Sequence, residues 1–238
     1  MVVTKNGVII FDGDDTLWRT QELYDFAKAE FEKLMKTQAF PENNIIELLD
    51  EQDAKRVEIS KFSKTRFFES MLIIYAFLCG KHNKKWDISI ESKIRELGFS
   101  VFTPPKLYDD AIPSIELLSK YFDLILFTNG DEEVQKRKID SLGEKFKSHF
   151  SRIYISEMKN EHEFRKIRDD LKVPTEKVLV VGNSVKSDIN PALKLGFKAI
   201  LIPRRTWEYE KSTLISDQVM IVHSLKEATK LIMEEREI

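Results

Sequence analysis

Six short, continuously apolar runs set the strongest limit on how this chain can fold. They are rich in Val, Ile and Leu and cover residues 7–11, 123–127, 152–156, 177–181, 198–202 and 218–222. Unbroken hydrophobicity is typical of strands covered on both faces, as in a parallel sheet. Apolar residues at three- and four-residue spacing predict helices between these runs, at 111–121, 132–143, 161–171 and 189–196. This alternation predicts an α/β fold with a doubly wound parallel sheet.

One long interval interrupts the alternation. From about Arg19 to Val101 the sequence shows helical patterns and no convincing strand. In residues 22–36 the spacing predicts one apolar face, made of Leu23, Phe26, Ala27, Phe31 and Leu34. We therefore expect an inserted all-helical domain at residues 18–103, and an α/β core made of residues 1–17 and 104–238.

Charge and composition exclude several classes of function. The 238 residues include 38 Lys and Arg against 40 Asp and Glu, so the chain lacks the excess of positive charge that is typical of nucleic-acid-binding proteins. No apolar run reaches the length of a membrane span, and the first residues show no signal pattern. The single cysteine, Cys79, fits a reducing compartment. We expect a cytoplasmic protein without nucleic-acid or membrane partners, either a monomer or a homodimer.

Three carboxylates are crowded directly after the first apolar run. In "GVIIFDGDDTLW" the aspartates Asp12, Asp14 and Asp15 lie within four residues. Like charges this close repel one another, and a divalent cation among them would relieve that repulsion. The sequence therefore predicts a cation site at the end of this strand.

Polar groups also follow the next three strands along the chain. They occur in "TNG", "SEMK" and "GNSVKSD", and the residues concerned are Thr128, Asn129, Lys159, Asn183 and Asp188. In open α/β sheets, ligands bind outside the carboxyl ends of the strands. We therefore expect acid, hydroxyl, amide and ammonium groups to meet at one edge of the sheet.

These four motifs, in this order, resemble those of the haloacid dehalogenase-like hydrolase superfamily. The resemblance is strongest to phosphatase-like members that carry "FDxDDTLW" and "GNSxxSDI", and it covers the α/β portion. The long helical interval between the first and second motifs is similar to the cap domain of that family. The resemblance implies a hydrolase with a helical cap that closes over a small substrate.

The resemblance also implies a role for each motif. Asp12 would be the nucleophile, and Asp14 would protonate the leaving oxygen and later accept a proton from water. Thr128 and Asn129 would donate hydrogen bonds to the phosphoryl group. Lys159 would neutralise charge on the nucleophile and the phosphoryl group, with Lys166 as a weaker rival within the following helix.

A magnesium site is expected from Asp12, the backbone carbonyl of Asp14, Asn183 and Asp188. Asn183 departs from the family pattern, in which most relatives have an aspartate. An amide oxygen is neutral, so this substitution should weaken Mg²⁺ binding without abolishing it.

The expected activity is Mg²⁺-dependent hydrolysis of a small phosphorylated metabolite through an aspartyl phosphate. Three alternatives stay open at this point. They are 2-haloacid dehalogenation, which needs neither Mg²⁺ nor a second acid, phosphomutase activity with the same residues, and a non-catalytic phosphate-binding or signalling protein.

Overall fold

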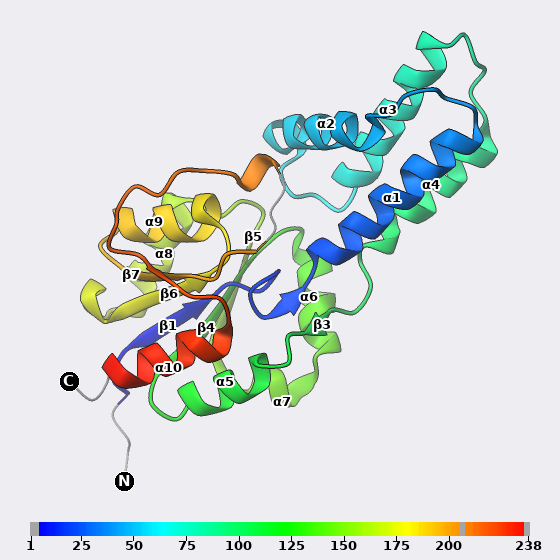
Figure 1. The fold of residues 1–238 in the computed structure, drawn as a ribbon. Helices are drawn as coiled ribbons and strands as arrows, with labels where there is room; N and C mark the ends of the chain where they lie inside the picture. Colours follow the sequence, from blue (N-terminus) through cyan, green and yellow to red (C-terminus); the bar gives the residue numbers. More distant parts are fainter. Residues whose placement is uncertain (1–4, 205–207, 236–238) are drawn as a thin grey trace. The chain divides into compact units, whose positions relative to one another are not determined.

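A computed structural model describes residues 5–204 and 208–235 (Figure 1). Within these residues the chain divides into two compact units. One unit contains residues 5–19, 104–204 and 210–235, and the other contains residues 20–103 together with 208–209. We call them the α/β unit and the helical unit.

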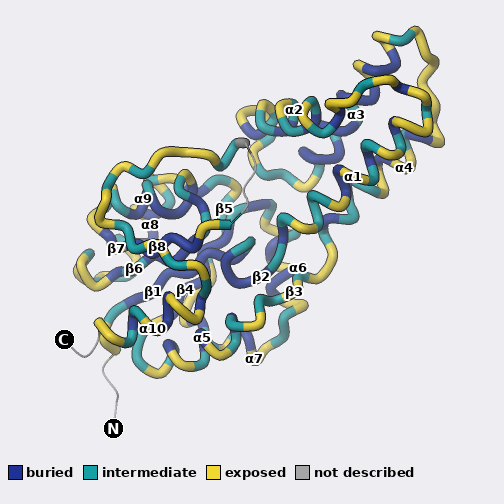
Figure 2. The backbone as a smooth tube through the Cα atoms, in the orientation of Figure 1, coloured by how far each residue is buried: buried dark blue, intermediate teal, exposed yellow. Residues whose placement is uncertain are grey.

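A six-stranded parallel sheet forms the centre of the α/β unit. Its strand order is β5-β4-β1-β6-β7-β8. The strands are β1 (Val8–Phe11), β4 (Asp123–Asn129), β5 (Phe150–Ser156), β6 (Val178–Gly182), β7 (Lys198–Leu201) and β8 (Met220–Ile221). Strand β1 is buried along its whole length between β4 and β6, as Figure 2 shows. All six predicted apolar runs therefore contribute a strand, although β8 is shorter than its run.

Helices cover both faces of this sheet (Figure 1). They are α5 (Ala111–Leu118), α6 (Glu132–Ser141), α7 (Gly143–Lys147), α8 (Glu161–Leu171), α9 (Asn190–Lys194) and α10 (Leu225–Glu235). Ile9 and Phe11 of β1 pack in one cluster with α5 and α10. The alternate residues Val8 and Ile10 pack in a second cluster with α8 and α9. Two apolar faces on one sheet explain the unbroken hydrophobic runs, and the predicted doubly wound fold is confirmed.

Two further features of the α/β unit were not anticipated. Strands β2 (Trp18–Arg19) and β3 (Lys106–Leu107) form a small antiparallel pair. A single π-helical turn, η2 (Val185–Ile189), precedes α9. Both are too short to leave a periodic pattern in the sequence.

The helical unit has a core of its own. It contains α1 (Gln21–Thr37), α2 (Ile45–Ser60), α3 (Arg66–Lys81) and α4 (Ile88–Ser100). The predicted face of α1 is partly wrong, because Phe26 is 64% exposed while Lys28 is buried and ion-paired with Asp50. The buried face runs through Ala27, Phe31 and Met35, which follow the helical period. No helix within the described residues is long and apolar enough to cross a membrane.

Candidate active site

The sheet order brings four loops together at the carboxyl ends of its strands. Asp12 directly follows β1, and β4 ends with Thr128 and Asn129. Lys159 lies shortly after β5, and Asp188 lies in the turn after β6. Since β5, β4, β1 and β6 are neighbours in the sheet, these residues come to one edge.

An ion-paired triad lies at the centre of this edge. The Nζ atom of Lys159 donates to Oδ1 of Asp12 at 2.5 Å and to Oδ1 of Asp188 at 2.8 Å. All three side chains are almost fully buried. The rival lysine, Lys166, is 60% exposed and pairs with Glu163 on α8 instead. Lys159 is therefore the lysine that contacts the candidate nucleophile.

Burial strongly affects the charges of the triad. It raises the pKa of Asp12 to about 8, because desolvation and the nearby charge of Asp188 outweigh the attraction of Lys159. Burial also disfavours the charged form of Lys159, which acts to lower its pKa. The charges and hydrogen bonds of Asp12 and Asp188 outweigh this effect, so the pKa of Lys159 is raised. Asp12 and Asp188 thus share Lys159 as a cationic partner in this dry site.

Asp14 is held by a separate set of donors. Oδ1 accepts hydrogen bonds from Nε1 of Trp18 at 2.6 Å and from Nζ of Lys138 at 2.7 Å. Oδ2 accepts a hydrogen bond from Nε2 of Gln135 at 2.9 Å. Gln135 and Lys138 lie one turn apart on α6, and both are buried. The carboxylate of Asp14 is therefore fixed by side chains from its own loop and from α6.

Gln135 connects Asp14 to the loop after β4. Its Oε1 accepts a hydrogen bond from Thr128 Oγ1 at 3.2 Å, and its Nε2 also donates to the Asn129 carbonyl at 2.9 Å. The side-chain oxygen of Asn129 accepts a hydrogen bond from the backbone N–H of Lys159 at 3.1 Å. One hydrogen-bond network thus runs from Asp14 to the triad.

The loop after β6 is held by a fourth carboxylate, that of Glu210. It accepts hydrogen bonds from the hydroxyls of Ser184 and, at 2.7 Å, of Ser187. Burial, with a further contribution from Asp188, raises the pKa of Glu210 even though the two serines act against the rise. In the same loop Asn183 accepts a long hydrogen bond of 3.5 Å from Thr16. Asn183 therefore faces the loop of the first motif.

Two glycines allow the close approaches in this site. A Cβ on Gly13 would lie 2.3 Å from the Trp18 indole ring, and a Cβ on Gly182 would lie 2.5 Å from the Asp188 carboxylate. Two residues after Gly13, Asp15 has a φ of 60°, which places it in the left-handed region that aspartate tolerates. The first motif therefore combines its carboxylates with a tight turn.

The sequence missed Gln135, Lys138 and Glu210. A signal existed for the two residues on α6, because they fall on the same buried face as Ile139. Polar residues on the inward face of a helix indicate a buried partner. Glu210 lies in a short turn far along the chain from Ser184, so nothing in the sequence indicated that pairing.

The residues present fit a magnesium ion, although they do not form a cluster rich in carboxylates. Within residues 5–204 and 208–235, no group of three or more His, Cys, Asp or Glu side chains is arranged to hold a metal. Mg²⁺ in proteins is often bound by only one or two carboxylates, with water and substrate oxygens completing its shell. Asp12 Oδ2 is buried without a hydrogen-bond partner among the described residues, which is the kind of atom that a cation would satisfy. The ligand roles of Asp14, Asn183 and Asp188 stay predictions.

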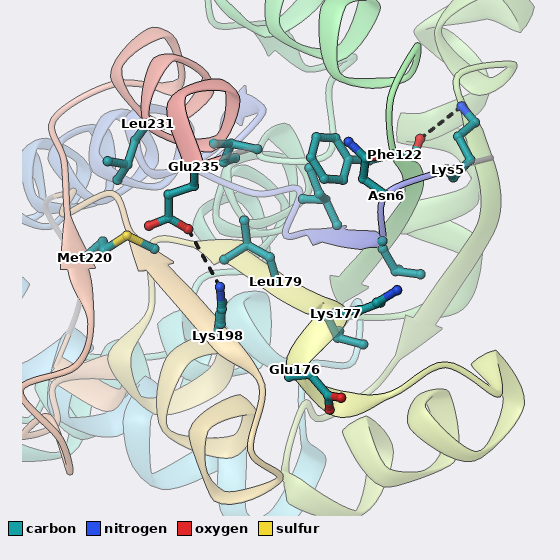
Figure 3. Close-up of a pocket in the computed structure, with 15 residues that line it drawn as sticks. Lys5, Asn6, Phe122, Glu176, Lys177, Leu179, Lys198, Met220, Leu231 and Glu235 are labelled. Carbon is teal, nitrogen blue, oxygen red and sulfur yellow. Dashed lines mark hydrogen bonds and ion pairs between the residues drawn. The ribbon is translucent and has the colours of Figure 1, made fainter. Parts of the chain in front are cut away.

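A cavity of about 550 Å³ lies elsewhere in the α/β unit (Figure 3). Its lining includes Gly7, Lys177 and Lys198, which stand at or next to the amino ends of β1, β6 and β7. Figure 3 also shows the ion pair between Lys198 and Glu235 at its rim. This cavity is at the opposite edge of the sheet from Asp12, so it takes no part in the candidate site.

Comparisons with known proteins agree with the fold of the chain. Among solved structures, the chain is similar to a haloacid dehalogenase-like family hydrolase from Xanthomonas campestris, with a TM-score of 0.78 and 18% identity over 97% of this chain and 96% of that chain. It is also similar to a HAD hydrolase from Bacillus subtilis bound to magnesium, with a TM-score of 0.62 and 19% identity over 96% and 99% of the two chains. An L-2-haloacid dehalogenase from Xanthobacter autotrophicus gives a TM-score of 0.62 and 14% identity over 97% and 99%. The TM-scores and coverage establish a shared fold, and at these identities they establish nothing more. No curated protein matches the sequence.

The family follows from the sequence model. A model described as haloacid dehalogenase-like hydrolase matches residues 7–196, a range that includes all four motifs. This match confirms the family and the hydrolase class predicted from the motifs. The chain belongs to the haloacid dehalogenase-like hydrolases.

Proposed function

We propose that this hydrolase cleaves phosphomonoesters of small metabolites with the help of Mg²⁺. The observation that carries the proposal is Asp14, a second carboxylate two residues from Asp12 that is held in place by Trp18, Gln135 and Lys138. An alkoxide leaving group needs a proton donor, and a halide leaving group does not. Asp14 is held in place by three side chains, and this favours a reaction in which Asp14 has a role, the cleavage of a phosphate ester.

The proposed reaction has two steps. A carboxylate oxygen of Asp12 attacks phosphorus, the ester P–O bond breaks, and the leaving oxygen takes the proton that Asp14 carries in its acid form. Water then attacks phosphorus and gives a proton to Asp14. The P–O bond to Asp12 breaks, inorganic phosphate leaves, and Asp12 is restored. Lys159 compensates charge at Asp12 throughout, and Asn129 supplies an amide for the phosphoryl oxygens, whereas the Thr128 hydroxyl would have to give up its hydrogen bond to Gln135 to serve as a donor. When bound beside Asp12, Mg²⁺ would supply charge neutralisation between two anions.

A second candidate is 2-haloacid dehalogenation. Several structures similar to this chain are dehalogenases, including proteins from Xanthobacter autotrophicus and Pseudomonas syringae. A buried aspartate beside a lysine, as in the pair of Asp12 and Lys159, also suits carboxylate attack on a carbon bearing a halogen. This reaction would use the triad but give Asp14 no role.

One experiment separates the two activities. Purified protein is assayed for phosphate release from p-nitrophenyl phosphate with Mg²⁺ or with a chelator, and for chloride release from 2-chloropropionate without metal. We expect phosphate release that depends on Mg²⁺ and falls at least about 1000-fold in Asp12→Asn. Asp15→Asn is the matched control, because asparagine also tolerates the left-handed backbone there, and its activity should stay within about threefold of wild type.

Chloride release in place of phosphate release would contradict the proposal and favour the dehalogenase. A phosphomutase would transfer the phosphoryl group to a sugar hydroxyl, so the assay is repeated with added sugar phosphates and the products are identified. Membership of a hydrolase family leaves the non-catalytic alternative without support. We also propose a cytoplasmic location, because the single cysteine, Cys79, is free and buried, as is typical of proteins in a reducing compartment.

A further inference from the structure

Lys138 is the least expected charged group near the candidate active site. It lies on α6, where its neighbours Lys136 and Arg137 are exposed and pair with Glu132 and Glu133 one turn earlier. Lys138 instead has a side chain that is only 6% exposed, and its ammonium group contacts Asp14. Burying an ammonium is costly unless a partner compensates it. The same helix thus carries two surface cations and one cation directed at Asp14.

Gln135 links Asp14 to the loop after β4. A single amide group bonds to Asp14, to the Asn129 carbonyl and to the Thr128 hydroxyl. A Cβ on Gly130 would lie 2.8 Å from the Gln135 amide nitrogen, so the glycine after Asn129 leaves room for this side chain. The amide is therefore packed as well as bonded.

The start of α6 fixes where these two side chains point. The carboxylate of Asp131 caps the helix by accepting hydrogen bonds from the backbone N–H groups of Glu133 and Val134. Residues one turn apart on a helix lie on the same face, so the capped helix presents Gln135 and Lys138 together. Their donors reach different oxygens of Asp14, which leaves the carboxylate little freedom to rotate.

We propose that Lys138 and Gln135 are positioning residues that hold the Asp14 carboxylate for proton transfer to the leaving group. The inference rests on the proposed phosphomonoesterase function and deepens it. Lys138 acts through Asp14 and does not bind the phosphoryl group itself. Its loss should therefore matter only to the extent that the leaving group needs a proton.

The test uses three substrates of similar size and different leaving groups: p-nitrophenyl, phenyl and benzyl phosphate. A p-nitrophenolate ion leaves readily without protonation, whereas the alkoxide of benzyl alcohol does not. For Lys138→Met we expect kcat to fall less than about threefold with p-nitrophenyl phosphate and about 10- to 100-fold with benzyl phosphate. KM should change little, and Lys138→Arg should recover part of the loss.

Two further variants show whether Lys138 acts through Asp14. Lys136→Met removes an exposed lysine from the same helix and should leave all three rates unchanged. In the Asp14→Asn background, Lys138→Met should change the rate with benzyl phosphate by no more than about twofold, because the group it positions is already gone. Circular dichroism and the melting temperature of Lys138→Arg control for folding.

The possible failures are distinguishable. Equal losses for all three substrates, or an equal loss in the Asp14→Asn background, would overturn the role of Lys138 and leave the phosphatase proposal standing. If the wild-type protein releases phosphate from none of the substrates, the proposed function fails and this inference fails with it.

Discussion

Asp188 packs its carboxyl group directly against the backbone of Gly182. A Cβ at position 182 would lie within 2.6 Å of three atoms of the Asp188 side chain. Contacts this short are not tolerated, so any larger residue must displace Asp188 and with it the ion pair to Lys159. Position 182, at the end of β6, therefore requires glycine for Asp188 to keep its place.

This restriction predicts the effect of Gly182→Ala. The variant should fold, because the added methyl group can be accommodated by a shift of one loop, but its phosphate release should fall at least about 100-fold. The measurement is kcat/KM with p-nitrophenyl phosphate, together with a thermal unfolding curve. Gly80→Ala is the control, since a Cβ there meets no atom within 4 Å, and replacing a helical glycine should add up to about 1 kcal/mol of stability. Unchanged activity in Gly182→Ala would show that Asp188 is not needed where it lies.

The sequence predicted the residues that follow strands and missed those on helices. Asp12 and Asp188 were predicted because the ends of parallel strands share an edge, whereas the role of Lys159 depended on the family resemblance. The structure brings the three side chains into contact. Lys138 shares the helical face of buried Ile139, but this signal is weak because a lysine on a helix normally faces water, and it does not identify the partner. Only the three-dimensional position of α6 shows that the partner is Asp14.

At the scale of elements, the loop between α1 and α2 is tied to the end of α3. Glu42 in this loop contacts His82 Nε2 at 2.6 Å and Lys81 Nζ at 3.0 Å. Burial disfavours the carboxylate charge, but the hydrogen bonds from His82 and Lys81 outweigh it and lower the pKa of Glu42 to about 2. This contact joins elements that are distant in sequence within the helical unit.

The lowered pKa predicts how stability depends on pH. A carboxyl group with a pKa below its unfolded value of 4.5 stabilises the fold above that pH, and the contribution is lost as the pH falls toward 2. We expect Glu42→Gln to lower the free energy of unfolding at pH 7 by on the order of 1–2 kcal/mol, allowing for partial exposure of the partners.

Unfolding of wild type and Glu42→Gln is measured between pH 7 and pH 2. The difference between them should shrink as the pH falls below about 4.5, while the exposed Glu47→Gln control should follow wild type throughout. A difference that stays constant with pH would mean that the charge of Glu42 does not stabilise the helical unit.

The elements themselves were largely predictable, and the exceptions share a cause. The periodic segments at 22–36 and 161–171 agree with α1 and α8 within a few residues. Gly196, the last residue of the predicted helix at 189–196, follows α9 with a φ of +78°. The pair of β2 and β3 and the turn η2 were missed because two to five residues carry no measurable period. On α1, Phe26 is apolar but lies outside the buried face of Ala27, Phe31 and Met35, so hydrophobicity alone predicts its burial wrongly.

At the scale of the whole molecule, the two units have separate hydrophobic cores. The core of the helical unit draws its buried residues only from positions between Ala27 and Val101. The three clusters of the α/β unit contain no residue from that interval. Each apolar cluster is therefore complete without the other unit, as expected of parts that can fold alone.

Separate cores predict that residues 20–103 fold when expressed without the rest of the chain. The fragment should show a helical circular dichroism spectrum and a single cooperative thermal transition, because its buried cluster and its ion pair between Arg66 and Asp53 are internal. Met71→Asp, which places a charge at a fully buried position, should abolish the transition, whereas a change at exposed Ile59 to Asp should not. A fragment that stays unfolded under these conditions would contradict the prediction and mean that residues 20–103 need the α/β unit for stability.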